Sequence, residues 1–524
     1  MLKSNLIGSI YKGTEHFYIA EHFANKNNSI VYIARDDREI FQVKEKLEWL
    51  LPKNKILIFR SWDQIPYDKV SPTKEVQSER IKTLYELVFN NIKNFIVLTS
   101  VNAIVQKTVN EIFIKNNVIE ITKKQKLDFH TLIHQLIMLG YQKTSIVREK
   151  SEFAVRGNII DIYLTDRKNP IRLDFFDNIV ESIKEFDFLT QKTSHELITK
   201  KILINPSSEI LLTEETIKLF RENFRNCFVD YRKSEYYHSI SEGILPSGIE
   251  QFLPFFNKKI SNFFLYCSNS DFLLNSNFIE LLETRFENIK DFYQARIDSL
   301  DIYNIHPKKL YLNYSNILNY LSKNRVYQFQ NFVIQNGKNF DLKIQSNLSS
   351  IKKEIDFNFI KKFIEINSPD KIIIICTQSK GSLIRIKKIL SDNISIKPIE
   401  ISSFEKSYIN KGNIYITVLK LEEAVHYEDK VYLNEKSLFG YNFTSLRKKS
   451  KQREVFFEEI NKFSPGIILV HIEYGFCKFI GVKKLNINES LHDCIELEFA
   501  DDEKLFLPIE NLNFISRYSN EDTG

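Results

Sequence analysis

The sequence predicts a multidomain α/β protein: a parallel α/β domain with a β-rich insertion, a second small α/β domain, and a small C-terminal β-barrel. Three observations predict this class. The 524 residues exceed what a single core usually contains. Near the N-terminus, apolar runs alternate with amphipathic stretches, as parallel sheets require. In two later regions short strand-like runs are separated by polar turns, which is typical of antiparallel sheets.

Strands and helices alternate through the first 120 residues. Ser29–Ala34 is an apolar run ended by charged residues, Glu39–Leu51 has helical spacing, and Lys55–Phe59 and Asn94–Thr99 are further strands. The same α/β pattern returns near Glu209. We therefore expect residues 1–120 and 201–325 to be two parts of one parallel α/β domain.

Between these parts, residues 121–200 form the β-rich insertion. Its expected strands are Asn158–Tyr163, Ile171–Phe176 and Val180–Phe186, joined by tight polar turns. Further along the chain, a strand at Lys371–Ile375 followed by a helix at Ser382–Ser391 predicts a small α/β domain over residues 340–442. We assign that domain no role.

Residues 443–462 are polar and charged, which predicts a helical linker, and residues 463–520 carry the pattern of a small barrel. Its strands are predicted at Ile467–His471, Cys477–Gly481, Cys494–Phe499 and Lys504–Pro508.

Composition excludes several classes of function. The net charge of +6 tolerates a nucleic-acid partner without requiring one, and the basic run Arg447–Lys451 suits a solvated face or linker better than a phosphate site. Five scattered cysteines without a C-x-x-C pair argue against a disulfide framework and a zinc site. No apolar stretch reaches the length of a membrane span. We expect a cytoplasmic protein with no membrane partner.

A phosphate-loop pattern near the N-terminus is broken. Gly8 and Gly13 have the G-x-x-x-x-G spacing, but Thr14 and Glu15 stand where a working loop has Lys and Ser or Thr. The missing ammonium neutralises phosphate in such loops, whereas a carboxylate repels it. ATP hydrolysis is therefore not expected from this loop, and chance spacing explains the two glycines about as well as a decayed loop does.

Catalytic and metal-binding patterns are sparse, so we predict no catalytic residue and no metal site. Ten histidines show no H-E-x-x-H or close His/Asp grouping. Asp161, Asp174 and Asp177 could suggest a carboxylate cluster, but their positions at strand ends and turns favour capping roles.

One strand of the insertion presents a candidate interface. Alternation places Arg172, Asp174 and Phe176 on one face of the strand, and Leu173 and Phe175 on the other. An arginine and an aromatic side chain on one outward face are typical interface anchors. An ordinary half-buried sheet, with Phe176 in a core, explains the same spacing equally well.

The sequence resembles the bacterial transcription-repair coupling factors (the Mfd family), whose first module is shared with UvrB. Motifs at both ends carry the resemblance. The UvrB-like motifs are Trp62–Asp68 with Ser71, Pro72 and Arg80, Gly140-Tyr141, Val147–Glu149, Glu152–Ile162, Pro170–Asp177, Val180–Ile183, and Ile244–Glu250 with Leu253-Pro254. Pro465-Gly466, Val470–Gly475, Phe479–Gly481, Lys504–Pro508 and Ser516–Tyr518 resemble the CarD-like RNA-polymerase-interacting domain, which UvrB lacks.

The resemblance implies partners and residues. The UvrB-like module of the family binds UvrA, and the residues that face UvrA correspond to Arg156, Arg172 and Phe176. The CarD-like barrel binds the β subunit of RNA polymerase, with an apolar contact at Leu485. The family's motor, an ATP- and Mg-dependent translocase that makes most DNA contacts, should begin where this chain stops at Gly524. We therefore expect no cofactor in this chain.

Together these features predict the adaptor portion of a transcription-repair coupling factor, which recognises polymerase stalled at DNA lesions and recruits UvrA. The chain would then be either a truncated form or the product of a split or decayed gene. Two alternatives belong to other classes: a UvrB-like nucleic-acid-dependent ATPase, and a stand-alone CarD-like transcription regulator.

Overall fold

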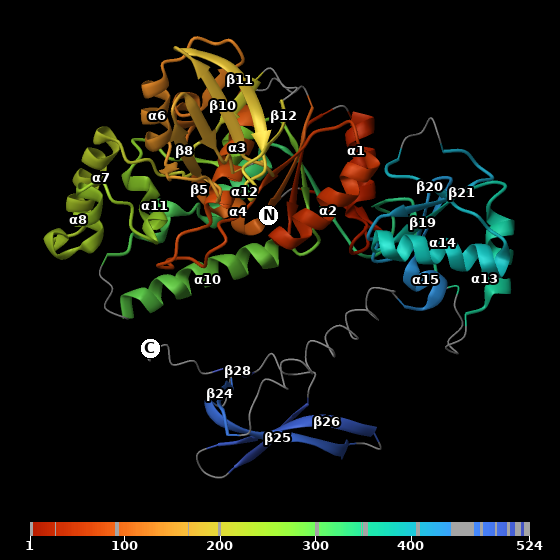
Figure 1. Ribbon diagram of the computed structural model, residues 1–524. Coiled ribbons are helices and arrows are strands. Elements are labelled where there is room, and N and C mark those ends of the chain that lie inside the picture. Colours follow the sequence, from red (N-terminus) through yellow and green to blue (C-terminus); the bar gives the residue numbers. More distant parts are fainter. Residues whose placement is uncertain are drawn as a thin grey trace. The chain divides into compact units, whose positions relative to one another are not determined.

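The computed structural model describes most of the chain (Figure 1). The described residues are 4–26, 28–89, 94–165, 167–196, 201–298, 303–346, 348, 355–404, 409–441, 466–471, 475–487, 490–499, 503–508 and 515–517. The chain divides into two compact units. The first contains residues 1–346, 364–376 and 398–434, and the second contains residues 347–363, 377–397 and 435–524. The predicted linker at 443–462 lies outside the described residues.

A seven-stranded parallel sheet forms the centre of the first unit. From edge to edge its strands are β17 (Lys338–Asn339), β1 (Asn5–Gly8), β16 (Arg325–Phe329), β15 (Asp271–Leu274), β2 (Ile30–Ala34), β4 (Ile96–Ser100) and β3 (Ile56–Phe59). The sheet thus joins strands from the N-terminal 100 residues to strands that follow the insertion, and it includes strands just past residue 325.

Both faces of this sheet are buried, which explains why its strands read as continuous apolar runs. Along β2, Val31 and Ile33 point into one hydrophobic core, and Ile30 and Tyr32 point into the other. Asp36 follows the strand and caps the next helix, because its carboxylate accepts a hydrogen bond from the Glu39 backbone N–H at 2.9 Å.

Helices cover the sheet and its extensions. In the first part of the chain they are α1 (Glu15–Lys26), α2 (Asp37–Leu50), α3 (Lys74–Phe89), α4 (Val101–Val105), α5 (Glu111–Asn116) and α6 (Phe129–Met138). After the insertion they are α7 (Glu214–Cys227), α8 (Glu235–Ser241), α9 (Phe263–Tyr266), α10 (Phe278–Asp298), α11 (Pro307–Leu310) and α12 (Tyr314–Ser322), with short 3₁₀ turns at Tyr231–Lys233 and Ile249–Phe255. Two short ladders, β5 (Lys107–Thr108) with β14 (Ser261–Asn262) and β6 (Ile119–Thr122) with β13 (Lys201–Ile204), complete this part.

The insertion forms a six-stranded sheet, drawn in orange to yellow in Figure 1. Its order is β12 (Thr193–Glu196), β11 (Ile179–Phe186), β10 (Ile171–Phe176), β9 (Ile159–Ile162), β8 (Glu152–Arg156) and β7 (Gln142–Lys143). All neighbouring strands are antiparallel except β7 and β8. One face packs with helix α6 in a separate core that includes Leu132, Ile160 and Leu173.

A second, mixed sheet packs against helices α1 and α2 within the first unit. Its order is β18 (Leu342–Ile344), β22 (Val425–Tyr427), β23 (Lys430–Asn434), β19 (Ile372–Thr377), β21 (Ile414–Val418) and β20 (Ile399–Glu400). The Trp49 indole N–H donates to the Thr417 hydroxyl at 2.9 Å, and the Tyr427 hydroxyl donates to Glu21 at 2.6 Å. Phe17 and Tyr432 pack at 4.9 Å between ring centroids. The two sheets therefore share one hydrophobic core.

The second unit contains the remaining helices and a five-stranded antiparallel sheet. The helix α13 (Phe357–Asn367) spans the two units, and α14 (Lys380–Ile394) and α15 (Glu435–Phe439) follow it. The C-terminal sheet has the order β27 (Lys504–Pro508), β26 (Ser490–Glu498), β25 (Gly475–Ile487), β24 (Ile468–His471) and β28 (Ile515–Arg517). Its core includes Leu469, Phe479 and Leu497. The predicted α/β class, with a small antiparallel sheet near the C-terminus, is confirmed.

A buried ion pair connects the insertion to the parallel sheet. Arg80 on α3 and Glu209 are both fully buried, and the Arg80 Nε–H donates to the Glu209 carboxylate. The same carboxylate accepts hydrogen bonds from the Trp62 indole and from the Thr108 hydroxyl, both at 3.3 Å. The Arg80 guanidinium also lies 4.3 Å from the Phe59 ring centroid. Removing one partner would leave a buried charge without compensation.

Within the described residues, none of the helices combines the length and the apolar character that crossing a membrane requires.

We expect Arg80→Met to destabilise the first unit by about 3–5 kcal/mol, because the Glu209 carboxylate stays buried without its charged partner. Urea unfolding monitored by tryptophan fluorescence measures this, since Trp62 contacts Glu209. Lys258→Met, which removes an exposed ion pair with Glu215, is the matched control and should leave the midpoint unchanged. A parental midpoint in the Arg80 variant would contradict the assignment.

Candidate functional site

The outer face of the insertion sheet carries the first set of predicted site residues. In the strand register Arg156 on β8 lies opposite Ile159, which lies opposite Asp174, and Asp161 lies opposite Arg172. Residues directly opposite each other in a ladder share a face. Because Phe176 is two residues beyond Asp174 on β10, the structure places Arg156, Arg172 and Phe176 on one face, away from the insertion core.

Phe176 lies outside the core, which decides between the two interpretations of the strand. It is 65% exposed, and its register partner Ile179 is 44% exposed. The two face each other where the β10–β11 hairpin turns through Asp177, whose φ is +51°. An exposed aromatic–aliphatic pair on a rigid hairpin is a ready apolar anchor.

Arg156 closes the neighbouring hairpin. It is exposed at the end of β8, and the turn continues through Gly157, whose φ of +56° lies in the left-handed region that glycine tolerates. The Phe175 backbone N–H donates to the Asn158 carbonyl at 2.9 Å, so this turn is fixed against β10. Arg156 forms no ion pair with the part of the chain that the structure describes, and its guanidinium faces solvent.

Arg172 is held by a carboxylate of its own sheet. Its Nε and Nη2 donate to the two oxygens of buried Asp161 at 2.7 and 2.9 Å, and Nη1 donates to the Thr193 hydroxyl at 3.2 Å. The guanidinium lies 4.6 Å from the Phe186 ring centroid. Three of its five N–H bonds are therefore used internally. Arg172 can offer a partner only its remaining N–H groups, in a fixed orientation.

Asp161 and Asp174 have partners within the sheet. Asp161 binds Arg172, and Asp174 accepts hydrogen bonds from the Ser182 hydroxyl and, at 3.0 Å, from Lys184 Nζ. Across the residues that the structure describes, no group of three or more His, Cys, Asp or Glu side chains is arranged to hold a metal ion.

The broken phosphate loop connects β1 to α1, at the carboxyl edge of the parallel sheet. This edge is where open α/β sheets place ligands. Gly8 ends β1 in a crowded position, since a Cβ atom there would lie 2.1 Å from Asn339 Oδ1. Gly13 has a φ of +85°. Both glycines are therefore required by local geometry, independently of any nucleotide.

Four backbone N–H groups of this loop, those of Ser9, Ile10, Gly13 and Thr14, have internal acceptors. Ser9 N–H donates to the Phe332 carbonyl at 2.9 Å, and Ile10 N–H donates to the Gln330 carbonyl at 3.0 Å. Gly13 N–H donates to Glu15 Oε1 at 3.0 Å. The Glu15 carboxylate thus takes the position at the α1 N-terminus that an anionic ligand would occupy.

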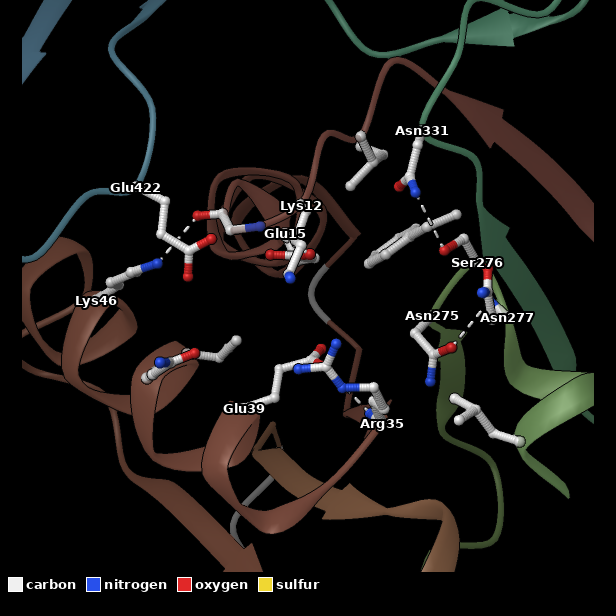
Figure 2. Close-up of a pocket in the computed structure, with 16 residues that line it drawn as sticks. Lys12, Glu15, Arg35, Glu39, Lys46, Asn275, Ser276, Asn277, Asn331 and Glu422 are labelled. Atoms are coloured by element: carbon white, nitrogen blue, oxygen red, sulfur yellow. Dashed lines mark hydrogen bonds and ion pairs between the residues drawn. The ribbon is translucent and has the colours of Figure 1, made fainter. Parts of the chain in front are cut away.

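The Thr14 hydroxyl and Lys46 are also committed to the loop. Thr14 Oγ1 donates to the Tyr11 carbonyl at 2.7 Å, and Lys46 Nζ on α2 donates to the Gly13 carbonyl at 3.0 Å. Glu422 from the mixed sheet covers the loop so closely that a Cβ on Gly13 would lie 2.9 Å from its carboxyl group. Figure 2 shows Lys46, Glu15 and Glu422 gathered around this loop.

The remaining cavity holds about 190 Å³ and is lined by equal numbers of acidic and basic side chains. The acidic side chains are Glu15, Glu39 and Glu422, and the basic side chains are Lys12, Arg35 and Lys46. Figure 2 labels all six. Burial raises the pKa of Glu15 to about 7, and the nearby Glu39 carboxylate adds to the shift. Burial lowers the pKa of Lys46, against the opposing effect of Glu422 and Glu15. A polyphosphate favours a clear excess of basic over acidic side chains, which this lining lacks.

The C-terminal sheet carries the other predicted site residue. Leu485 lies on β25 and pairs with His492 on β26, near the end of a long hairpin. Its side chain lies outside the described part of the structure. On the neighbouring strand β26 the buried Glu496 carboxylate accepts a hydrogen bond from Lys504 at 3.0 Å and forms an ion pair with Lys483 at 2.7 Å. These two lysines lower the pKa of Glu496.

Sequence reasoning missed several residues of these surfaces. Ile179, the partner of Phe176, could have been found from its place directly after the Asp177-Asn178 turn. Asp161 could have been paired with Arg172 from the hairpin register. Lys46 and Glu422 carry no local signal, because each reaches the loop from a distant part of the chain.

At the level of domains, family models match two parts of the chain. The UvrB interaction domain matches residues 119–209, which include Arg156, Arg172 and Phe176. The CarD-like/TRCF RID domain matches residues 463–519, which include Leu485. Two segments of the chain are therefore similar to a UvrB-type interaction domain and to a CarD-like domain.

Along almost its whole length the chain is similar to transcription-repair-coupling factors. It is 28% identical to the protein of Rickettsia bellii over 516 residues, which cover 96% of this chain and 45% of that protein. It is 26% identical to the protein of Haemophilus influenzae and 24% identical to that of Escherichia coli, with 98% and 99% of this chain covered and 45% of each relative. The predicted resemblance to an N-terminal half of this family is confirmed, and the chain spans less than half the length of these relatives.

We expect Glu15→Gln to stabilise the chain in a pH-dependent manner. The pKa of Glu15 in the folded protein, about 7, lies above its unfolded value of 4.5. Ionised Glu15 therefore costs stability, and this cost is absent below pH 4.5 and complete once the pH has risen through 7. With a discount for partial exposure, the variant should gain roughly 2–3 kcal/mol at pH 8.

Urea unfolding of both proteins at pH 5 and pH 8 measures this difference. Glu48→Gln, an exposed position on α2, is the control, and its difference from the parent should not grow with pH. A Glu15 variant that is equally displaced from the parent at both pH values would exclude titration of this carboxyl group.

Proposed function

We propose that this chain takes part in transcription-coupled DNA repair as an adaptor, binding UvrA through its insertion and the β subunit of RNA polymerase through its C-terminal sheet. The observation that carries the proposal is the occurrence of two different interaction domains in one chain, a UvrB interaction domain and a CarD-like domain. The relatives' name, transcription-repair-coupling factor, joins the same two processes.

The outer face of the insertion supports the UvrA assignment. Arg156 offers a free guanidinium to carboxylate partners, and Phe176 with Ile179 offers an apolar anchor beside it. Arg172 contributes differently. Its ion pair with Asp161 fixes the guanidinium, so its remaining N–H groups are presented to a partner in a fixed orientation. Binding of a partner then requires little loss of side-chain conformational entropy at Arg172.

The C-terminal sheet supports the polymerase assignment through its long β25–β26 hairpin, which presents Leu485 close to its end. An apolar residue in that place suits an apolar contact with a partner.

We assign no ATP-driven step to the N-terminal loop. Four of its N–H groups have internal acceptors, and its cavity is lined by as many acidic as basic side chains. Translocation on double-stranded DNA, with its ATP and Mg²⁺, is proposed for the remainder of the full-length family rather than for these residues. The cytoplasm is the proposed compartment.

Arg156→Ala combined with Phe176→Ser should weaken UvrA binding by at least about tenfold per substitution, because the variant loses both a charged donor and the apolar anchor. Arg172→Lys, which keeps the charge and loses the planar fork, is preferred to Arg172→Ala, which would strand buried Asp161. Interferometry with purified UvrA measures affinity, and Arg232→Ala, an exposed arginine outside the insertion, is the control. UvrA binding equal to the control would refute the residue assignment.

Leu485→Arg should abolish binding to RNA polymerase while UvrA binding persists, since a charge is expensive in an apolar contact. Co-purification with polymerase measures this, and the Arg156 and Phe176 double variant, which should still bind polymerase, is the reciprocal control. Circular dichroism checks that the sheet stays folded. Undiminished polymerase binding by a folded Leu485 variant would contradict the assignment.

A further inference from the structure

A groove outside the insertion and the C-terminal sheet has side chains of the kinds that line nucleotide-binding sites. It encloses about 580 Å³ between α10, α11 and the start of α12. Its floor and walls include the rings of Phe286, Tyr293, Tyr311 and Tyr314, and we call it the aromatic groove. Sites for small ligands commonly have this size and this mixture of rings with a few polar groups.

The rings are held in place by each other and by the core. Phe286 and Tyr314 meet edge-to-face at 6.2 Å, and Tyr293 meets His306 at 5.8 Å. Buried Tyr67 packs against both Tyr293, at 5.2 Å, and Tyr311, at 6.2 Å. Phe286, Tyr293 and Tyr314 are only half-buried and so present ring surface to the groove. Rigid, accessible rings are platforms on which bases stack.

Cations collect at one end of the groove. Lys290 is one turn before Tyr293 on α10, and Lys308 follows His306, which packs on Tyr293. Both lysines are exposed and form no ion pair with the described residues. Lys107 Nζ donates to the Lys308 carbonyl at 2.8 Å, and its partial burial lowers its pKa. An anion at this end would have three ammonium groups and would offset the desolvation of Lys107.

Carboxylates and amides also line the groove. Glu283 and Glu287 lie on either side of Phe286 on α10, and Asn313 and Asn316 lie beside Tyr314, which packs on Phe286. Glu283 is seven residues from Lys290, which is roughly 10 Å of helix, whereas Glu287 is one turn from Lys290. Glu283 is therefore the acceptor for amino groups that lies furthest from Lys290 along α10.

We propose that the aromatic groove binds one nucleotide unit, with the base stacked on the rings, the base edge toward Glu283, and the phosphate toward Lys290 and Lys308. The carboxylates repel phosphate and accept hydrogen bonds from exocyclic amino groups, so they orient the ligand. A peptide would also meet apolar and charged groups here. The bounded volume and the number of rings favour a flat aromatic ligand with a single anionic end.

Equilibrium binding to the full chain tests the proposal with two probes, fluorescein-labelled dA12 by anisotropy and AMP by calorimetry. Binding of either probe supports a nucleotide site, and the probe that binds more tightly identifies a strand or a free nucleotide as its source. Lys290→Glu with Lys308→Glu should weaken binding at least tenfold. For dA12 it should also reduce the salt dependence by about two phosphate contacts. Tyr314→Phe should bind as the parent does, whereas Tyr314→Ala should lose affinity.

Lys323→Glu, an exposed charge reversal at the end of α12 outside the groove, is the matched control and should retain parental affinity. An abasic strand of the same length tests for stacking and should bind at least tenfold more weakly than dA12. The proposal is overturned if neither probe binds at millimolar concentration, if the abasic strand binds as tightly as dA12, or if the groove variant and the control lose affinity equally.

Discussion

The buried pair of Arg80 and Glu209 is the interaction on which the arrangement of the first unit depends. Glu209 is the last residue of the UvrB interaction match, and Arg80 lies on a helix of the parallel sheet. Trp62, in the loop after β3, and Thr108, in the short ladder beyond α4, donate to the same carboxylate. Both segments are thereby hydrogen-bonded to Glu209. A buried charge with several fixed donors tolerates few alternative geometries. Within the first unit this pair therefore fixes the insertion sheet against the parallel sheet.

Local patterns in the sequence predicted several strands and helices and the direction in which side chains of a strand point. The alternation along β10 predicted that Arg172 and Phe176 share a face, because a strand has a period of two whatever surrounds it. It left open whether that face was exposed. The answer depends on α6, which packs with the opposite face through residues such as Leu132. No spacing within β10 encodes that choice.

Contacts across long stretches of chain could not be read from sequence. The broken loop was visible from Gly8, Gly13 and Glu15, but Lys46 is 33 residues from the carbonyl it binds, and Glu422 comes from a different sheet. Trp49 and Thr417, which help to place that sheet, are 368 residues apart. Arg172 is the intermediate case. Its partner Asp161 is only 11 residues away, yet pairing the two requires the hairpin register.

The internal acceptors of the phosphate loop also limit how this site can evolve. A working nucleotide site differs from it at several positions at once: a lysine is needed, Glu15 must release the Gly13 N–H, and the mixed sheet must withdraw Glu422 from above the loop. No single substitution accomplishes all three, because the side chains concerned lie at separate positions of the chain. The loop is thus several coordinated changes away from a working nucleotide site.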